Sequence, residues 1–261
     1  MKVLAVEAHP DDAEIICAGT LARLAAMGHD VSILSITAGD LGTNGDSVEA
    51  TIRTRTEEAR RAAAVISARF FCAGIADKHV FFTEENRNRV TEIFRRLTPE
   101  LLFIPSPKDY VLDHEFTSLL ARDAATAASA ALFQTGAYDA APATHGIPSL
   151  YYCDPVGRID IFGNPVLATT YVDISDSLET KVKMYNCHAS QVDFLRQRHK
   201  QDYVREIRTW AADAGKLAGF SGAEGFRQHL APPFPKNNVL VELLGARLIQ
   251  DTLKRPAISQ E

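Results

Sequence analysis

A short apolar run near the start of the chain leads directly into a cluster of ionisable side chains. Residues Val3 to Val6 are all apolar, and after one glutamate the chain continues Ala8-His9-Pro10-Asp11-Asp12-Ala13-Glu14. A helical pattern begins near Ile15, which places the cluster at the end of a first β-strand. Open α/β sheets bind their ligands at the carboxyl ends of their strands. The stretch therefore predicts an α/β fold with a site at that edge.

The side chains in this turn have the chemistry of a catalytic metal site. His9 and Asp12 are three residues apart with a proline between them, so a tight turn can direct both at one point. A neutral imidazole and a carboxylate are ordinary zinc ligands, and catalytic zinc sites use three protein ligands plus water. Asp11 would then lie beside the metal as a general base. The alternative is a plain turn in which Asp12 caps the helix, but capping needs neither His9 nor Asp11.

Length and composition limit the class of protein. The 261 residues suit one large α/β domain or two small ones, and 46% hydrophobic with 23% charged residues is typical of a soluble globular protein. We find no repeat, low-complexity tract or linker, so we predict a single domain over residues 1–261. The net charge of −5 and the lack of a Lys/Arg-rich run argue against a nucleic-acid partner.

The cysteines and the N-terminus indicate the compartment. Cys17, Cys72, Cys153 and Cys187 lie far apart and form no Cys-x-x-Cys pair, which favours reduced residues over a disulfide frame. The N-terminus has only a short apolar run before Glu7, too little for a signal peptide. No segment approaches the length of a membrane span. We therefore expect a cytoplasmic protein.

The hydrophobic pattern alternates between strands and helices, which is the pattern of parallel βαβ units. Strands are predicted at 2–6, 31–37, 70–71, 79–82, 101–104, 150–153 and 169–172. Helices are predicted at about 13–27, 47–66, 84–97, 108–132, 176–198, 199–210 and 223–230, while 239–243 fits either structure. The C-terminal third is the more irregular part, and the tail from Lys254 is expected to fray.

A histidine follows a later strand. Leu101 to Ile104 are fully apolar, as in a central strand, and Lys108-Asp109-Tyr110-Val111-Leu112-Asp113-His114 follow closely. His114 is thus predicted at the same edge of the sheet as His9 and Asp12. A lone histidine at a helix start is most often a cap or a surface residue. Because a His-x-x-Asp pair lies at the same edge, we interpret His114 as the third metal ligand.

Two loops have more than one interpretation. The stretch from Gly39 to Gly45 contains three glycines after the second strand, which is weak evidence for phosphate binding because it lacks the G-x-G-x-x-G spacing. It leaves open a nucleotide- or phosphate-binding module without hydrolase activity. Residues 134–148 form a small, polar loop that either lines a substrate cleft or is a plain connector.

With these motifs placed, the chain resembles the PIG-L/LmbE-like family of zinc-dependent N-acetylglucosamine deacetylases. The family signature is Ala-His-Pro-Asp-Asp near the N-terminus with a second histidine motif farther along. The resemblance includes Ala8 to Asp12, Thr37 to Asp40, Thr43 to Gly45, Arg55, Glu57 to Ala59, Asp109, Asp113-His114, Ser190-Gln191 and Ala223 to Phe226. It implies a Rossmann-like, mostly parallel sheet with helices on both faces, and family members are often homo-oligomers.

The resemblance also assigns the metal and the base. His9, Asp12 and His114 match the zinc ligands and Asp11 matches the general base, although such a donor set also accepts Fe²⁺ or Co²⁺. The implied reaction is hydrolysis of an acetamide in an N-acetylglucosamine-type sugar or conjugate. Zinc lowers the pKa of its bound water toward ~7, and Asp11 takes the proton as the oxygen attacks. A sister activity in the family cleaves an amide in thiol conjugates.

Further residues are candidates for substrate contacts and support. Arg55 matches an arginine near the active site of the family, and Arg55 and Asp40 are candidates for substrate binding through hydrogen bonds to sugar hydroxyls. Asp113 either holds a ligand histidine in its working tautomer or caps a helix.

The chain departs from the family at one position. The second motif usually reads His-Pro-Asp-His, and its first histidine stabilises the oxyanion or acts as an acid, but here valine stands there, at Val111. Losing one oxyanion donor commonly costs on the order of 10²–10³ in turnover. We hypothesise that His188 or Tyr110 fills the gap, with His188 favoured as a catalytic acid by its reference pKa. The departure also leaves open a zinc-binding scaffold with vestigial catalysis.

Overall fold

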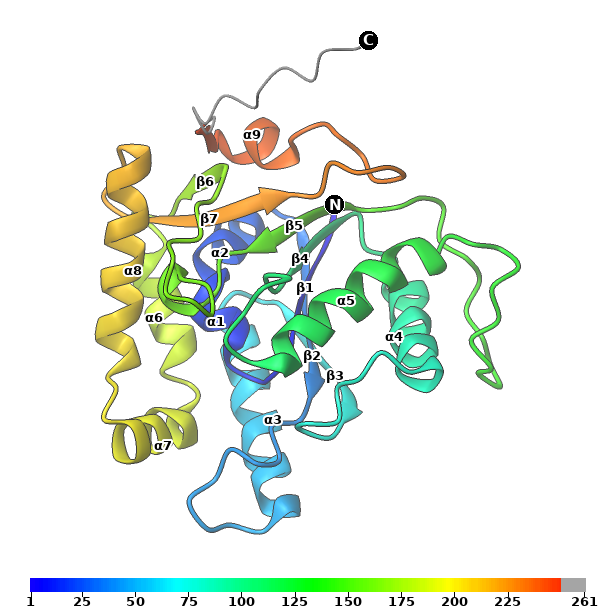
Figure 1. The fold of residues 1–261 in the computed structure, drawn as a ribbon, viewed down its shortest axis with the longest axis horizontal. Helices are drawn as coiled ribbons and strands as arrows, with labels where there is room; N and C mark the ends of the chain where they lie inside the picture. The colour runs from blue at the N-terminus through cyan, green and yellow to red at the C-terminus, as the bar shows by residue number, and fades with distance from the viewer. Residues whose placement is uncertain (250–261) are drawn as a thin grey trace.

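The computed structural model describes residues 1–249, and the expected fraying of the tail from Lys254 lies outside the described residues. Within this range the chain forms one eight-stranded sheet with the order β3-β2-β1-β4-β5-β7-β6-β8 (Figure 1). The strands are β1 Lys2–Glu7, β2 Asp30–Thr37, β3 Arg69–Ile75, β4 Leu101–Ile104, β5 Ser149–Cys153, β6 Thr170–Asp173, β7 Ala223–Gln228 and β8 Arg247–Leu248.

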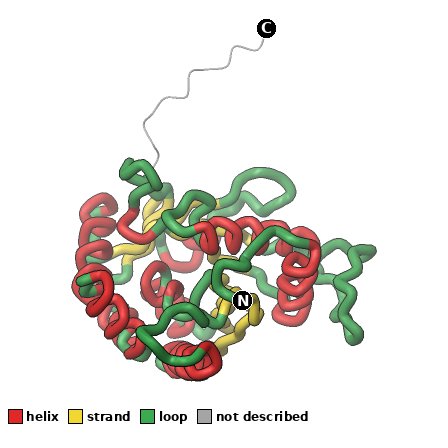
Figure 2. The backbone as a smooth tube through the Cα atoms, turned by 60° about the horizontal axis from the view of Figure 1, so that its bottom comes forward, coloured by secondary structure: helices red, strands yellow, loops and turns green. Residues whose placement is uncertain are grey.

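Helices connect the strands and cover the sheet on both faces (Figure 2). They are α1 Asp12–Ile16, α2 Ala18–Ala26, α3 Val48–Ala64, α4 Glu84–Leu97, α5 Leu112–Ala127, α6 Leu178–Tyr185, α7 Ala189–His199, α8 Tyr203–Ala218 and α9 Val239–Leu244, with a short 3₁₀ turn η1 at Val156–Arg158. No helix within residues 1–249 is both long enough and apolar enough to cross a membrane.

The sheet has a parallel part and an antiparallel part. The five strands from β3 to β5 in the sheet order pair in parallel, whereas β5 with β7, β7 with β6 and β6 with β8 pair antiparallel. Parallel strands end at one edge, so the loops after β1, β2, β4 and β5 all begin there. The predicted α/β class with a mostly parallel sheet and helices on both faces is confirmed.

Two apolar layers follow from the alternation of side chains along the strands. Val3 and Ala5 of β1 lie in the layer shared with α1, α2, α3 and α9. Leu4 and Val6 lie in the opposite layer, with α4 and α5. Because both faces of β1 are covered, its side chains from Val3 to Val6 are all apolar, as expected for a central parallel strand.

Two predicted helices are each divided in the structure. The helix predicted at 13–27 breaks at Cys17, where φ is −138° and ψ is 1°. The new N-terminus is capped from a distance, because the backbone N–H groups of Gly19 and Thr20 donate to the carboxylate of Glu224 in β7. The helix predicted at 176–198 likewise divides into α6 and α7. A cap supplied from a distant strand leaves no local sequence signal.

Two other segments were assigned the wrong structure. Residues 223–230 were predicted as a helix, but 223–228 form β7, in which Phe226 enters the core and Glu224 forms a buried ion pair with Lys181. Residues 79–82 were predicted as a strand and form a loop instead. The side chain of Asn86 donates to two carbonyls of that loop, which satisfies backbone groups that a strand would pair.

The loop at 134–148 lies away from the carboxyl edge of the sheet. It leads into the amino end of β5, where the Ser149 N–H donates to the Glu100 carbonyl just before β4. Thr144 and His145 line a cavity of about 610 Å³ together with Met1 and Lys2 at the start of β1. The same loop projects to the right in Figure 1. Of the two interpretations of this loop, its position at the amino end of the sheet favours the plain connector, and a role in lining a substrate cleft stays a prediction.

Candidate metal centre

Three side chains converge at the carboxyl edge of two neighbouring strands. His9 lies in the turn after β1, Asp12 is the first residue of α1, and His114 lies in the first turn of α5, which follows β4. Because β1 pairs with β4, the two turns lie side by side. One ligand atom from each residue lies within 4.8 Å of the other two. The fold thus brings together the three predicted metal ligands.

The distances within this group fit a zinc ion. The Oδ2 atom of Asp12 lies 3.3 Å from His9 Nδ1 and 3.3 Å from His114 Nε2. Two atoms bound to zinc at 2.0–2.1 Å in tetrahedral geometry are about 3.3–3.4 Å apart. The backbone N–H of His9 donates to the same oxygen at 2.8 Å, which fixes the carboxylate in this position.

A carboxylate stands behind each histidine. Asp113 Oδ2 lies 3.3 Å from His9 Nε2, and Asp109 Oδ1 lies 3.1 Å from His114 Nδ1. Each carboxylate favours a proton on the nitrogen that it faces, which leaves the other nitrogen with a lone pair directed at Asp12. Three lone-pair atoms that face one another repel unless a positive charge lies among them. The donor set and its tautomers therefore fit a metal cation.

The pKa shifts of His9, His114 and Asp12 also indicate that positive charge stabilises this group of side chains. Burial acts to lower the pKa of His9, but hydrogen bonds to Asp113 and Asp12 raise it to about 9. Burial also acts on His114, yet Asp12 and Asp109 raise the pKa of its imidazole well above the ordinary value. Burial opposes ionisation of Asp12, but the two imidazoles hold its pKa well below the usual range. Two protons or one divalent cation satisfy this arrangement.

Asp11 has a strained backbone and a perturbed carboxyl group. Its φ is 133°, a conformation that side chains other than glycine rarely adopt and that is concentrated at functional sites. Its Oδ1 accepts a hydrogen bond from Arg55 Nη2 at 2.9 Å. Burial raises the pKa of Asp11 to about 6, although the charge of Arg55 acts to lower it. A carboxyl with a pKa near neutrality suits a general base.

Arg55 is buried beneath Asp11 and bonds to the protein itself. It is 4% exposed and also donates to the carbonyls of Pro10 and Gly39. A Cβ atom at Gly39 or Gly42 would lie 2.2–2.3 Å from the guanidinium, so these glycines make room for Arg55. The glycine-rich loop therefore has a structural purpose that needs no phosphate.

The two predicted substrate-binding residues both have protein partners in the structure. Arg55 bonds to Asp11 and two carbonyls, and the Asp40 side chain accepts from the backbone N–H of Asp77 at 2.8 Å. Their contact with a substrate stays a prediction.

The two candidates for the missing histidine lie in different surroundings. His188 is fully buried at the start of α7, and its Nε2 lies 3.3 Å from Glu14 Oε2. Burial acts to lower its pKa, but Glu14 raises it above the ordinary value. The Tyr110 ring packs edge-on against the His114 imidazole, with 5.4 Å between ring centroids. Tyr110 thus contacts a predicted metal ligand directly, whereas the ion pair of His188 is with Glu14.

Sequence reasoning gave no role to two acidic residues of the site. Asp109 faces His114, and Asp77 Oδ1, a buried atom without a hydrogen-bond partner, lies 4.0 Å from His9 Nε2. Asp109 carries a signal, since it precedes the histidine by five residues in one loop. Asp77 follows β3, two strands away from His9 in chain order, and only the pairing of the strands brings it near.

Comparison with known proteins agrees with the geometry. Residues 4–125 match the sequence model of the PIG-L family, described as GlcNAc-PI de-N-acetylase. The chain is 29% identical to diacetylchitobiose deacetylase of Thermococcus kodakarensis, over 87% of this chain and 82% of that protein. It is 26% identical to 4-oxalmesaconate hydratase of Pseudomonas putida, over 73% of this chain and 74% of that protein.

A solved structure of a deacetylase is also similar to this chain. The N,N'-diacetylchitobiose deacetylase of Pyrococcus horikoshii superposes with a TM-score of 0.73 at 25% identity, and the match covers 88% of this chain and 86% of that one. The matched domain contains His9, Asp12 and His114. Over residues 4–125, the part that contains these three side chains, the chain is therefore similar to the PIG-L family, and its relatives include N-acetyl-sugar deacetylases.

Proposed function

We propose that the protein is a zinc-dependent hydrolase that removes the N-acetyl group from an N-acetylglucosamine-type sugar or conjugate. The observation that carries the proposal is the convergence of His9, Asp12 and His114, with a carboxylate behind each histidine. The similarity to deacetylases that are named for diacetylchitobiose supports this class of substrate.

Three atoms would hold the ion: His9 Nδ1, Asp12 Oδ2 and His114 Nε2. Three protein ligands leave a position for water or substrate, as catalytic zinc sites require. When bound, zinc lowers the pKa of water and polarises an acyl oxygen. The same donor set accepts Fe²⁺ or Co²⁺, so elemental analysis of the purified protein is needed to identify the native ion.

Asp11 is assigned as the group that moves the proton. Arg55 holds one carboxylate oxygen at 2.9 Å, which leaves the other oxygen to accept a proton from the attacking water. With a pKa of about 6, the carboxyl is mostly ionised at neutral pH and still basic enough to take that proton. The same group then returns the proton to the leaving amine.

Tyr110 is assigned as the donor that replaces the histidine missing at Val111. Tyr110 is 59% exposed, and its phenol is protonated at neutral pH because a tyrosine hydroxyl ordinarily has a pKa near 10. A protonated phenol beside His114 has a hydrogen to offer a developing oxyanion. The His188 imidazole lies 3.3 Å from the Glu14 carboxylate instead, which supports a role for it that does not involve the substrate.

Release of acetate tests the proposal. The substrates are N-acetylglucosamine, N,N'-diacetylchitobiose, and lipid-linked and thiol-linked N-acetylglucosamine, each incubated with metal-stripped and zinc-reloaded protein. We expect acetate from at least one of them, lost on stripping and restored by zinc. A protein that binds zinc at His9, Asp12 and His114 but releases no acetate from any of them would contradict the proposal and leave a scaffold with vestigial catalysis.

Water addition is a second candidate, which the similarity to a hydratase favours. That relative covers 73% of this chain and is named for 4-oxalmesaconate. Hydration and deacetylation both begin with an activated water molecule, so the same metal centre serves either reaction. Loss of 4-oxalmesaconate without acetate release from the sugars would replace the deacetylase proposal. An amide-linked thiol conjugate in the same panel tests the amidase alternative.

A further inference from the structure

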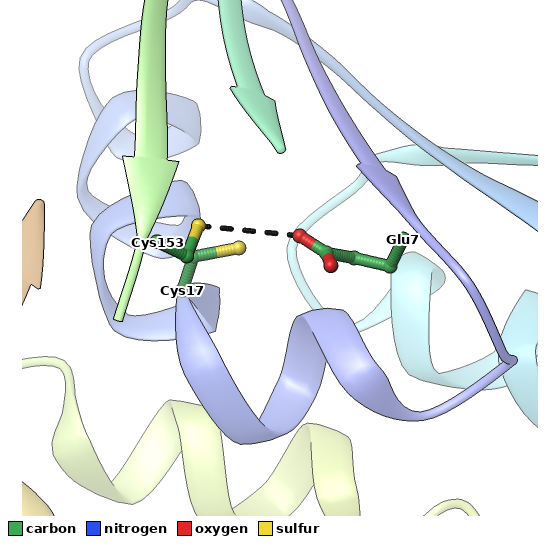
Figure 3. A group of neighbouring side chains, drawn as sticks. All are labelled: Glu7, Cys17 and Cys153. Atoms are coloured by element: carbon green, nitrogen blue, oxygen red, sulfur yellow. Dashed lines mark hydrogen bonds between the residues drawn. The ribbon is translucent and has the colours of Figure 1, made fainter. Parts of the chain in front are cut away.

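A second group of ligand-type side chains lies beneath the metal centre. Glu7 ends β1, Cys17 separates α1 from α2, and Cys153 ends β5. Figure 3 shows the three side chains directed toward one another, and one ligand atom of each lies within 4.8 Å of the other two. We call these residues the Cys–Glu cluster. All three are buried, with exposed fractions of 0–1%.

Glu7 lacks the partners that a buried carboxylate needs. Its described side-chain hydrogen bond comes from the Cys153 thiol, a weak donor, at 4.0 Å between Sγ and Oε1. The ion pairs found within residues 1–249 do not include Glu7. Glu7 is thus a buried carboxyl group without a cationic partner among the described residues. Such a group requires a proton or a cation beside it.

A second buried glutamate of the same protein shows the contrast. Glu224 forms an ion pair with Lys181 and accepts backbone hydrogen bonds from Gly19 and Thr20. Its charge is therefore fully compensated by groups of the chain. Glu7 is equally buried, but the atoms that converge on its carboxyl are two thiol sulfurs. A neutral thiol donates only a weak hydrogen bond to a carboxylate. Two thiolates and a carboxylate can instead bind one metal ion together.

The backbone supports the convergence. Cys17 leaves the helical conformation, with φ −138° and ψ 1°, in a stretch whose hydrophobic pattern predicts one continuous helix. The break therefore coincides with a residue of the cluster. Glu7 and Cys153 end two strands of one sheet, and the register of β1 and β5 against β4 places both side chains on the same face.

We propose that Glu7, Cys17 and Cys153 form a second, buried metal site for a thiophilic divalent ion such as Zn²⁺, in which both oxygens of the Glu7 carboxylate would complete four ligand atoms with the two thiolates. Two sulfur ligands favour zinc over Mg²⁺ or Ca²⁺, which prefer oxygen. Binding releases the protons of two thiols and one carboxyl group and involves no oxidation or reduction. The ion would tie the ends of β1 and β5 to the junction of α1 and α2, which is a structural role independent of the proposed reaction.

Cobalt gives a direct test. Co²⁺ bound by thiolates absorbs strongly in the near ultraviolet through charge transfer, whereas Co²⁺ bound by imidazole and carboxylate does not. The full chain is expressed in medium supplemented with Co²⁺, and the metal content and the spectrum are measured. We expect two equivalents per chain and a charge-transfer band in the wild-type protein. Cys17→Ser and Cys153→Ser should each bind one equivalent and lose the band.

Matched variants separate the two sites. Cys72→Ser and Cys187→Ser change thiols outside the cluster and should keep both equivalents and the band. His114→Ala should lose one equivalent and keep the band, so failure of the metal centre and failure of this proposal give different results. A wild-type protein without the band overturns the proposal even if a serine variant does not fold. A band that survives in folded Cys153→Ala overturns it as well.

Discussion

The metal centre and the Cys–Glu cluster offer the same number of ligand atoms at the end of the same strand, yet their surroundings differ. In the metal centre, carboxylates face the outer nitrogens of His9 and His114, and the His9 side chain is 18% exposed. In the Cys–Glu cluster, the side chains are sealed inside an apolar layer. Ligand number alone therefore does not define a reactive site. Access for substrate and a supporting layer of hydrogen bonds make the difference.

Chain position explains why the surroundings differ. Glu7 and Cys153 are the last residues of their strands and point into the layer beneath the sheet edge. His9, Asp12 and His114 come from turns that begin where the strands stop. A strand residue is held between packed layers, whereas a turn residue at the carboxyl edge can face a ligand. A shift of two residues, from Glu7 to His9, moves a side chain from the core to the site.

The largest effect on turnover is expected from Asp11→Asn, because Asp11 stands beside the metal centre and has no counterpart in the Cys–Glu cluster. We expect kcat to fall by roughly 10²–10⁴, the range for a general base, with both metal equivalents retained. Acetate release and elemental analysis check the two parts. Asp46→Asn in an exposed loop is the matched control. Loss of a metal equivalent in Asp11→Asn would instead make Asp11 a ligand.

Tyr110→Phe removes one hydroxyl without changing the packing on His114. We expect kcat to fall on the order of 10²–10³ while metal content stays constant, as for loss of an oxyanion donor. His188→Gln should have a smaller effect on kcat. Steady-state kinetics of the two variants show which residue, Tyr110 or His188, replaces the missing histidine. A larger loss of kcat in His188→Gln than in Tyr110→Phe would assign that role to His188.

Substitution of the carboxylates that face His9 and His114 should weaken metal binding at the metal centre and leave the Cys–Glu cluster unchanged. Asp109→Asn and Asp113→Asn should each weaken metal binding at the centre by roughly 10–100-fold, the usual range for such supporting groups. Titration with a competing chelator measures the affinity. The thiolate band of the Cys–Glu cluster should not change. Asp123→Asn, farther along α5, serves as the control, and equal losses in all three variants would refute a specific supporting role.

Arg55 should set the pH range of the reaction through Asp11. The base works only when its carboxyl is ionised, so wild-type activity should decline as the pH falls through about 6. Arg55 lowers the pKa of Asp11, and removing its charge therefore raises that pKa. In Arg55→Gln the acid limb of kcat/KM should move about 1–3 pH units higher, the range for a close opposite charge. An unmoved acid limb would rule out proton transfer through Asp11.

Removal of metal from the Cys–Glu cluster should affect stability more than turnover. An ion at 100 times its Kd adds about 2.7 kcal/mol to the free energy of unfolding. The wild-type protein should lose stability of this order when a strong chelator is present during urea denaturation. Cys153→Ser, which lacks the site, should show a smaller change with chelator. Equal chelator effects in both proteins would place all the stabilising metal at the other centre.

Sequence alone determined the elements that carry the site. The apolar run before His9 and the run at Leu101–Ile104 identify two buried strands, and parallel strands end at one edge. Two short motifs at those ends were therefore enough to place His9, Asp12 and His114 together. This succeeded because hydrophobic periodicity and motif spacing are properties of neighbouring residues.

Tertiary structure alone decided which partners those elements find. The cap of α2 comes from Glu224, more than two hundred positions away along the chain, and the alternation that makes 223–228 a strand matters only because Phe226 meets a core built by other elements. The pairing of Glu7 with Cys17 and Cys153 depends on strand order in the same way. Such contacts form between residues distant in sequence, so their energies leave no mark on local periodicity.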